Sequence, residues 1–157
     1  MVQLKEGMRA PEFKLSASNG EETALGDFKG KKRAVLYFYP KDDTPGCTTE
    51  ACGFRDNLKT IETQDAVILG VSPDGVDSHN KFIGKFKLPF TLLSDPDKKV
   101  CQAYGVWVKK SLYGKEYMGV ARTTFVIGKD GKIEKIYEKV KPEGHAEEVL
   151  EFLRKNQ

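Results

Sequence analysis

The sequence predicts an α/β fold in a single domain spanning residues 1–157, and three observations support this prediction. The length of 157 residues is close to that of one average domain. Strand-like and helix-like segments alternate along the chain without a long linker or a low-complexity tract. Two continuous apolar runs, residues 34–39 and 67–71, are typical of strands buried on both faces of a sheet.

The first half of the chain predicts a hairpin followed by a strand–helix–strand unit. Short strands over residues 13–15 and 22–24 flank a turn and form a small N-terminal hairpin. The strand over 34–39 is central, and the segment 48–63 after it carries apolar residues at spacings of three and four, as a helix does. Together with the strand over 67–71, this arrangement implies a parallel crossover.

The second half adds shorter elements. Ser78 is expected to cap a helix that runs to residue 85, before a short strand over 90–93. A short helix holding Val100 and Tyr104 follows. The remaining predicted elements are strands over 106–113, 122–127 and 133–140, the last two joined by a tight turn, and a final amphipathic helix over 145–155.

Composition excludes several classes of protein. Charged residues make up 31% of the chain, the net charge is +3, and the lysines are scattered among nearly as many acids, so nothing favours nucleic-acid binding. No apolar run approaches the ~20 residues needed to cross a bilayer. Residues 1–7 lack the apolar stretch of a secretory signal, so we expect a cytoplasmic protein.

The most informative stretch is the loop that leads from the first buried strand to Cys47. It is rich in residues that break regular structure, and it delivers the cysteine to the first turn of the predicted helix. There, unpaired backbone N–H groups and the helix dipole favour the thiolate form of a cysteine, which is the nucleophile. We therefore expect Cys47 to be catalytic.

The run from Tyr37 to Cys52 resembles the active-site signature of the peroxiredoxins, and within them the peroxiredoxin Q group, also called bacterioferritin comigratory protein. The resemblance covers almost the whole chain and includes residues 93–97, 104–107, 122–127 and 130–133. It implies a thioredoxin-like fold with a central mixed sheet flanked by helices. It also implies reduction of hydroperoxides by a cysteine, without a metal or another cofactor.

The resemblance assigns roles to five residues. Cys47 takes the position of the cysteine that attacks the peroxide, Thr44 supplies a hydroxyl three residues before it, and Pro40 shields the pocket. Arg122 takes the position of the active-site arginine, and Glu50 that of a glutamate that holds the arginine in place. Fixed donors around a peroxide lower the barrier because negative charge moves from sulfur to the departing oxygen. The Thr44 hydroxyl is expected to accept a hydrogen bond from the peroxide and to donate one to the thiolate.

Cys52 is the candidate for the thiol that resolves the Cys47 sulfenic acid as an intramolecular disulfide. Residues five apart on a helix are separated by about 8.7 Å between Cα atoms. A disulfide needs roughly 4.4 to 6.8 Å, so the first turns of the helix must unwind before the bond can form. Cys101 lies on the apolar side of a short helix and is expected to be structural, although a redox role for it stays open.

Other features leave alternatives open. We expect recycling by thioredoxin or a glutaredoxin-like dithiol protein, and a monomer. A thioredoxin-like disulfide exchanger is disfavoured because four residues separate the two thiols instead of two. A non-enzymatic redox sensor or chaperone, switched by the Cys47–Cys52 disulfide, is the alternative from another class. His79 and His145 lack a metal-ligand cluster and are expected at the surface or as helix caps.

Overall fold

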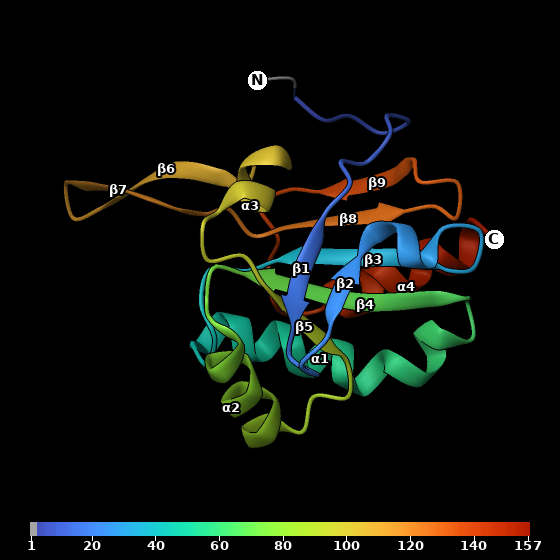
Figure 1. Cartoon of the computed structure of the whole chain (residues 1–157), viewed down its shortest axis with the longest axis horizontal. Helices are drawn as coiled ribbons and strands as arrows, with labels where there is room; N and C mark the ends of the chain where they lie inside the picture. Colours follow the sequence, from blue (N-terminus) through green and yellow to red (C-terminus); the bar gives the residue numbers. More distant parts are fainter. Residues whose placement is uncertain (1–2) are drawn as a thin grey trace.

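The computed structural model describes residues 3–157. Met1 and Val2, which the predicted domain and the expectation about a secretory signal both include, lie outside the described residues. Seven strands form one sheet in the order β2-β1-β5-β4-β3-β8-β9 (Figure 1). Their bounds are β1 Lys14–Ala17, β2 Glu22–Ala24, β3 Arg33–Phe38, β4 Ala66–Ser72, β5 Thr91–Ser94, β8 Thr123–Ile127 and β9 Ile133–Tyr137. The helices are α1 Pro45–Glu62, α2 Val76–Phe86, α3 Lys99–Ala103 and α4 His145–Lys155, and a 3-10 turn covers Leu25–Phe28.

The sheet is mixed, as predicted. Strand β3 runs parallel to β4, and β4 runs parallel to β5, so β3, α1 and β4 form the expected crossover. Strand β8 is antiparallel to both β3 and β9. The N-terminal hairpin β1–β2 is not separate from the main sheet, because β1 pairs with β5 and extends its edge.

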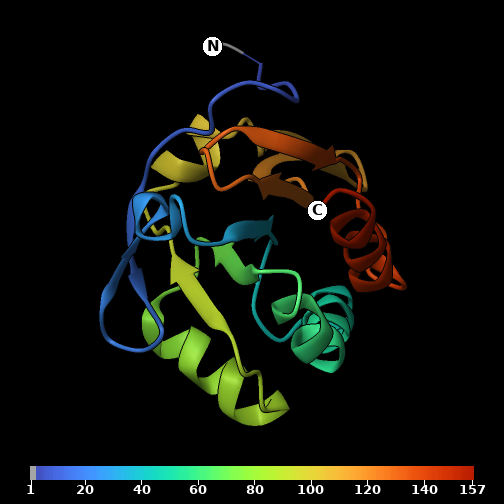
Figure 2. The ribbon, with the colours of Figure 1, turned by 90° about the vertical axis from the view of Figure 1, so that its right-hand side faces the viewer.

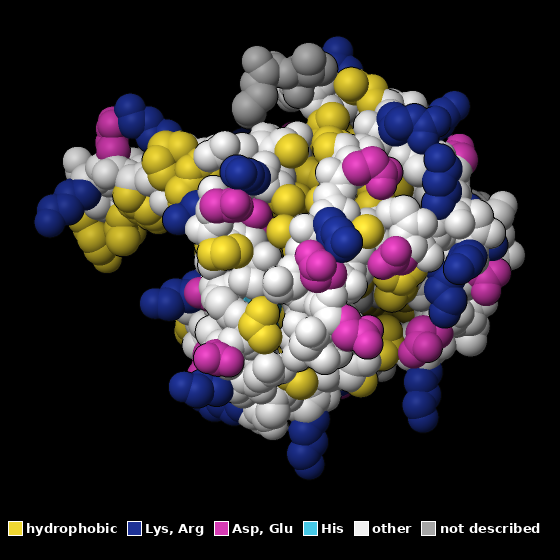
Figure 3. Space-filling model, in the orientation of Figure 1, with side chains coloured by type: hydrophobic (Ala, Val, Ile, Leu, Met, Phe, Trp, Pro, Cys, Tyr) yellow, Lys and Arg dark blue, Asp and Glu magenta, His cyan; other side chains and the backbone are white. Residues whose placement is uncertain are grey.

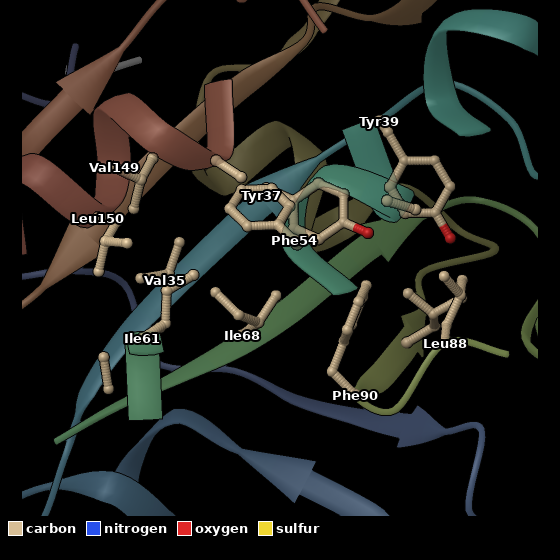
Figure 4. Close-up of a cluster of buried hydrophobic side chains, with 14 of the residues drawn as sticks. Val35, Tyr37, Tyr39, Phe54, Ile61, Ile68, Leu88, Phe90, Val149 and Leu150 are labelled. Atoms are coloured by element: carbon tan, nitrogen blue, oxygen red, sulfur yellow. The ribbon is translucent and has the colours of Figure 1, made fainter. Parts of the chain in front are cut away.

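Alternating side chains of β3 divide the interior into two cores. Val35 and Tyr37 face α1, α2 and α4, whereas Leu36 and Phe38 face the side covered by α3 and the N-terminal segment. All six residues of β3 are buried, which confirms the prediction of a central strand. Helices α1 and α4 lie side by side on one face (Figure 2). Figure 4 shows the first core, where Tyr37 lies against Phe54 of α1 with ring centroids 4.8 Å apart.

The structure differs from the prediction at two helix starts, at the last strand, which ends at Tyr137 and not at residue 140, and in one missed strand. Helix α1 begins at Pro45, three residues earlier than expected, because proline suits the first helical position, where an N–H would have no intrahelical partner. Helix α2 begins at Val76, so Ser78 lies inside it and is not its cap. A strand at 115–120 was missed by the prediction, because its first four residues are exposed and carry no buried alternation.

That missed strand, β7 (Lys115–Val120), pairs with β6 (Trp107–Leu112) as a separate two-stranded sheet. The two strands form an arm that extends away from the body of the molecule (Figure 1). Tyr113 and Gly114 at its end have φ of 52° and 79°, the left-handed region that a tight hairpin turn requires. Within residues 3–157, no helix has the length and hydropathy to cross a membrane.

Candidate active site

Cys47 is the third residue of α1, the helix that follows the carboxyl end of the central strand β3. The loop 39–44 connects the end of β3 to this helix. Open α/β sheets build their sites at the carboxyl ends of strands, and Cys47 follows this rule. The residue is only 1% exposed, and its thiol is free.

Arg122 contacts both the cysteine and the glutamate that the sequence placed with it. Its Nη2 donates to Sγ of Cys47 at 3.3 Å, and its Nη1 donates to Oε1 of Glu50 at 2.6 Å. Arg122 immediately precedes β8, whose first residue pairs with the last residue of β3. Sheet pairing therefore brings Arg122 to Cys47 across 75 positions of sequence.

Burial and charge oppose each other at Glu50. Burial raises the pKa of its carboxyl from 4.5 to about 7, although the Arg122 guanidinium acts in the opposite direction. For Arg122 the balance is reversed: burial lowers its pKa, but Glu50 and the Cys47 thiolate together raise it above the ordinary value. Arg122 thus stays protonated beside the sulfur. Within residues 3–157, Oε2 of Glu50 and the Tyr37 hydroxyl are buried without a hydrogen-bond partner.

Thr44 and Pro40 lie on the loop before the helix, and both are half-buried. Thr44 occupies the N-cap position with extended backbone. Its hydroxyl donates to the carbonyl oxygen of Lys41 at 2.9 Å, so the expected donation to the Cys47 thiolate is wrong for this structure. The hydroxyl oxygen keeps its capacity to accept a hydrogen bond.

Gly46 allows the arginine to approach the helix closely. A Cβ atom at this position would lie 3.2 Å from Nη2 of Arg122 and 3.4 Å from Pro142. Glycine therefore leaves the guanidinium the room that it uses to reach Cys47. The prediction did not include Gly46, although the glycine directly before the cysteine was a signal for it.

The other two cysteines occupy different environments. Cys52 lies on α1 and is half-buried, with a free thiol. Cys101 is fully buried in the core on the opposite face of the sheet, as expected for a structural residue. Burial, followed by the neighbouring Asp95 carboxylate, raises the pKa of the Cys101 thiol and keeps it protonated.

His79 is not a surface or cap residue; it is fully buried in α2. Its Nδ1 lies 2.7 Å from Oδ2 of Asp42, and its Nε2 lies 2.9 Å from the carbonyl oxygen of Leu93. Tyr39 also donates to Asp42 at 2.6 Å. Asp42 belongs to the loop between Pro40 and Thr44, so this buried network, which the sequence did not reveal, fastens that loop to α2 and β5.

His145 is also buried, contrary to the expectation, at the start of α4. Its Nε2 lies 2.7 Å from the Thr124 hydroxyl of β8, and its Nδ1 lies 2.6 Å from the Glu148 carboxylate. Burial lowers the pKa of His145, which favours the neutral ring despite the Glu148 carboxylate. Its ring packs edge-on against Phe54, so it joins α4 to α1 and β8.

Comparisons with known proteins agree on one family. The AhpC/TSA family matches residues 7–136. Peroxiredoxin Bcp of Bacillus subtilis is 51% identical over 153 residues, which cover 98% of this chain and 97% of that protein.

Solved structures give the same result. PrxQ of Xylella fastidiosa superposes with a TM-score of 0.92 at 37% identity, covering 99% of this chain and 98% of that one. The bacterioferritin comigratory protein of Xanthomonas campestris, studied for alkyl peroxide reduction, superposes with a TM-score of 0.89 at 39% identity, covering 96% and 98%. Together with the Cys47–Arg122 contact, these matches show that the chain belongs to the AhpC/TSA family and is a thiol-dependent peroxidase of the peroxiredoxin Q group.

Proposed function

We propose that Cys47 is the residue that attacks the hydroperoxide, and the observation that carries this proposal is its hydrogen bond from Arg122. The thiolate sulfur attacks the terminal peroxide oxygen, the O–O bond breaks, and an S–O bond forms. Charge leaves the sulfur and develops on the departing oxygen, which takes a proton and leaves as water or an alcohol. Cys47 is left as a sulfenic acid.

Each neighbour has a separate part in this step. Arg122 stabilises the thiolate and, with its remaining N–H groups, the developing negative charge on the leaving oxygen. Glu50 positions Arg122 through the 2.6 Å hydrogen bond. The Thr44 oxygen accepts a hydrogen bond from the peroxide, and Pro40 limits the access of water. Because Cys47 is 1% exposed, the peroxide reaches it through small movements of these side chains.

Cys52 then resolves the sulfenic acid. Its sulfur attacks the Cys47 sulfur, the S–S bond forms, and hydroxide leaves as water after taking a proton. Both residues belong to the regular helix α1, so the step requires the start of that helix to unwind. A dithiol protein, thioredoxin or a glutaredoxin-like reductant, exchanges with the disulfide and is itself oxidised.

The substrates of this chain include hydrogen peroxide and organic hydroperoxides. The Xanthomonas campestris relative studied for alkyl peroxide reduction supports the organic class. We further propose that the protein acts as a monomer in the cytoplasm, where thiol reductants keep cysteines reduced.

Two cysteine variants test the mechanism. Cys47→Ser is expected to abolish peroxide consumption, because serine does not supply a thiolate. Cys52→Ser is expected to consume one equivalent of peroxide rapidly and then stall in steady-state turnover with thioredoxin and its reductase. Mass spectrometry after one equivalent of peroxide locates the disulfide in the wild type. A persistent activity of Cys47→Ser, or unchanged turnover of Cys52→Ser, contradicts the assigned roles.

A further inference from the structure

The arm formed by β6 and β7 holds the exposed large hydrophobic side chains found among residues 3–157. They are Leu112, Tyr113, Tyr117 and Met118, with exposed fractions of 56%, 97%, 47% and 50%. Figure 3 shows hydrophobic side chains on the projecting arm, with basic and acidic side chains beside them. Exposed apolar residues concentrated on one element mark an interaction surface.

Strand alternation assigns the arm residues to two faces. Lys110 pairs with Tyr117 and Leu112 pairs with Lys115, and these two pairs alternate with Lys109–Met118 and Ser111–Glu116. Directly paired residues point to the same side of a hairpin. One side, which we call the basic face, therefore carries Lys110, Leu112, Lys115 and Tyr117.

The charges on the two faces differ. The basic face has two lysines and no acid, whereas Lys109 on the other face forms a 2.7 Å ion pair with Glu116. The cations of the basic face are thus left for an external anion, next to an aliphatic and an aromatic side chain. Tyr113 adds a fully exposed aromatic ring at the end of the arm.

The base of the arm lies beside the active site, because β7 ends at Val120, two residues before Arg122, which donates to Cys47. Lys110 is half-buried and pairs with Tyr117 in the outer half of the arm. Burial lowers the pKa of Lys110, the Arg122 cation lowers it further, and the charge on Cys47 raises it. The side chains of Lys110 and Tyr117 lie across Gly119, where a Cβ atom would meet them at 3.3 and 3.4 Å.

The combination of residue types distinguishes between partners. Protein interfaces are depleted of lysine, and their preferred cation is arginine, which the arm lacks. Lysines beside tyrosine and leucine suit the boundary between anionic headgroups and acyl chains. The arm covers only residues 107–120, fewer than the roughly 20–30 residues a side of a standard protein interface. We propose that the basic face of the β6–β7 arm docks on an anionic phospholipid bilayer and brings the Cys47 site to its surface.

Flotation with vesicles tests this docking independently of peroxidase activity. The reduced protein is mixed with vesicles of phosphatidylcholine containing one-quarter phosphatidylglycerol, or of phosphatidylcholine alone. Wild type is expected to float with the anionic vesicles and to be released by about 0.5 M salt, which shortens the Debye length to a few ångströms. The variant Leu112→Thr/Tyr117→Thr keeps strand-forming side chains on the arm and is expected to bind the anionic vesicles about tenfold more weakly.

Met118→Thr is the matched control, because Met118 is similarly exposed but lies on the opposite face. It is expected to bind as wild type does, and hydrogen peroxide turnover by both variants shows that they fold. Absent flotation, equal binding to neutral vesicles, or equal losses in the two variants overturns the proposal. A dimer in solution that the basic-face variant converts to a monomer also overturns it, because a second copy then covers this face.

Discussion

The position of the Arg122 guanidinium depends on Gly46, which has no side chain. Gly46→Ala would place a Cβ atom 3.2 Å from Nη2 of Arg122, which is also hydrogen-bonded to Cys47. We expect the guanidinium to shift by a few tenths of an ångström, and kcat/KM for peroxide to fall roughly tenfold, since misplacement of a positioned group is costly. The measurement is steady-state peroxide reduction.

Gly53→Ala is the control for this prediction, because it makes the same substitution on the same helix. Its Cβ atom would lie 3.5 Å from Ala146, which is an ordinary contact. Both variants gain helix propensity, up to about 1 kcal/mol, so neither is expected to lose stability. Equal activity of the two variants would show that Gly46 has no part in positioning Arg122.

Glu50 makes the stability of the fold dependent on pH. Its pKa rises from 4.5 in the unfolded chain to about 7 on folding, mainly through burial. Its contribution to stability is therefore present below about pH 4.5 and is lost as the pH rises through about 7, a change of up to about 3 kcal/mol. Glu50→Gln removes this titration. Urea unfolding at pH 5 and pH 8 gives the free energy of unfolding of each protein. We expect this free energy to fall less between the two pH values in Glu50→Gln than in wild type.

At the scale of secondary structure, the buried network around Asp42 fixes the loop that precedes the catalytic helix. Burial raises the pKa of Asp42, but the hydrogen bonds with His79 and Tyr39 lower it by more, so the pKa lies below its ordinary value. The Asp42 amide also donates to Asp74 at 2.7 Å. The loop carrying Pro40 and Thr44 is thus held at its middle, and unwinding of α1 can begin beyond Thr44 without displacing them.

His79→Gln is expected to destabilise the protein by about 2–3 kcal/mol, because it removes the ring that contacts the buried Asp42 carboxylate and the Leu93 carbonyl oxygen. Ser78→Ala is the control: Ser78 donates to the same carboxylate at 2.7 Å, but the loss of a neutral donor costs about 1 kcal/mol. Hydrogen exchange of the Asp42 amide is expected to accelerate far more in the histidine variant. Similar exchange in the two variants would contradict a role of His79 in holding the loop.

The sequence predicted the elements whose residues carry a local signal. The apolar run of β3, the stripe of α1 and the tight turn between β8 and β9 were all predicted correctly because burial and turn chemistry act over a few residues. The His79 network was missed because its partner Asp42 is 37 positions away, and local pattern does not reveal such pairing. The arm strand β7 was missed because its exposed residues have no buried face.

The site shows the same limit. The motif identified Cys47, Arg122 and Glu50, and the structure brings these three together. The motif did not reveal that the Thr44 hydroxyl donates to Lys41, because this contact depends on the path of the loop.

At the scale of the whole molecule, the proposed Cys47–Cys52 disulfide has one stabilising and one destabilising effect. Closing a loop of about six residues restricts the unfolded chain and stabilises the fold by about 2 kcal/mol. Unwinding the start of α1 removes the Arg122 contacts of Cys47 and Glu50. Phe54 is fully buried between Tyr37 and His145. If unwinding reaches Phe54 and exposes its ring, the free energy of unfolding falls by about 3–5 kcal/mol.

The loss of packing is the larger effect, so the oxidised protein is expected to melt roughly 5 °C below the reduced protein, given the usual relation between free energy and melting temperature for a chain of this size. Differential scanning calorimetry of the two redox states measures the shift. Cys52→Ser treated with one equivalent of peroxide is the control, because it oxidises at Cys47 without closing the loop, and it is expected to melt close to its reduced form. An oxidised wild type that melts above the reduced protein would mean that α1 forms the disulfide without releasing Phe54, and that unwinding stops within its first turn.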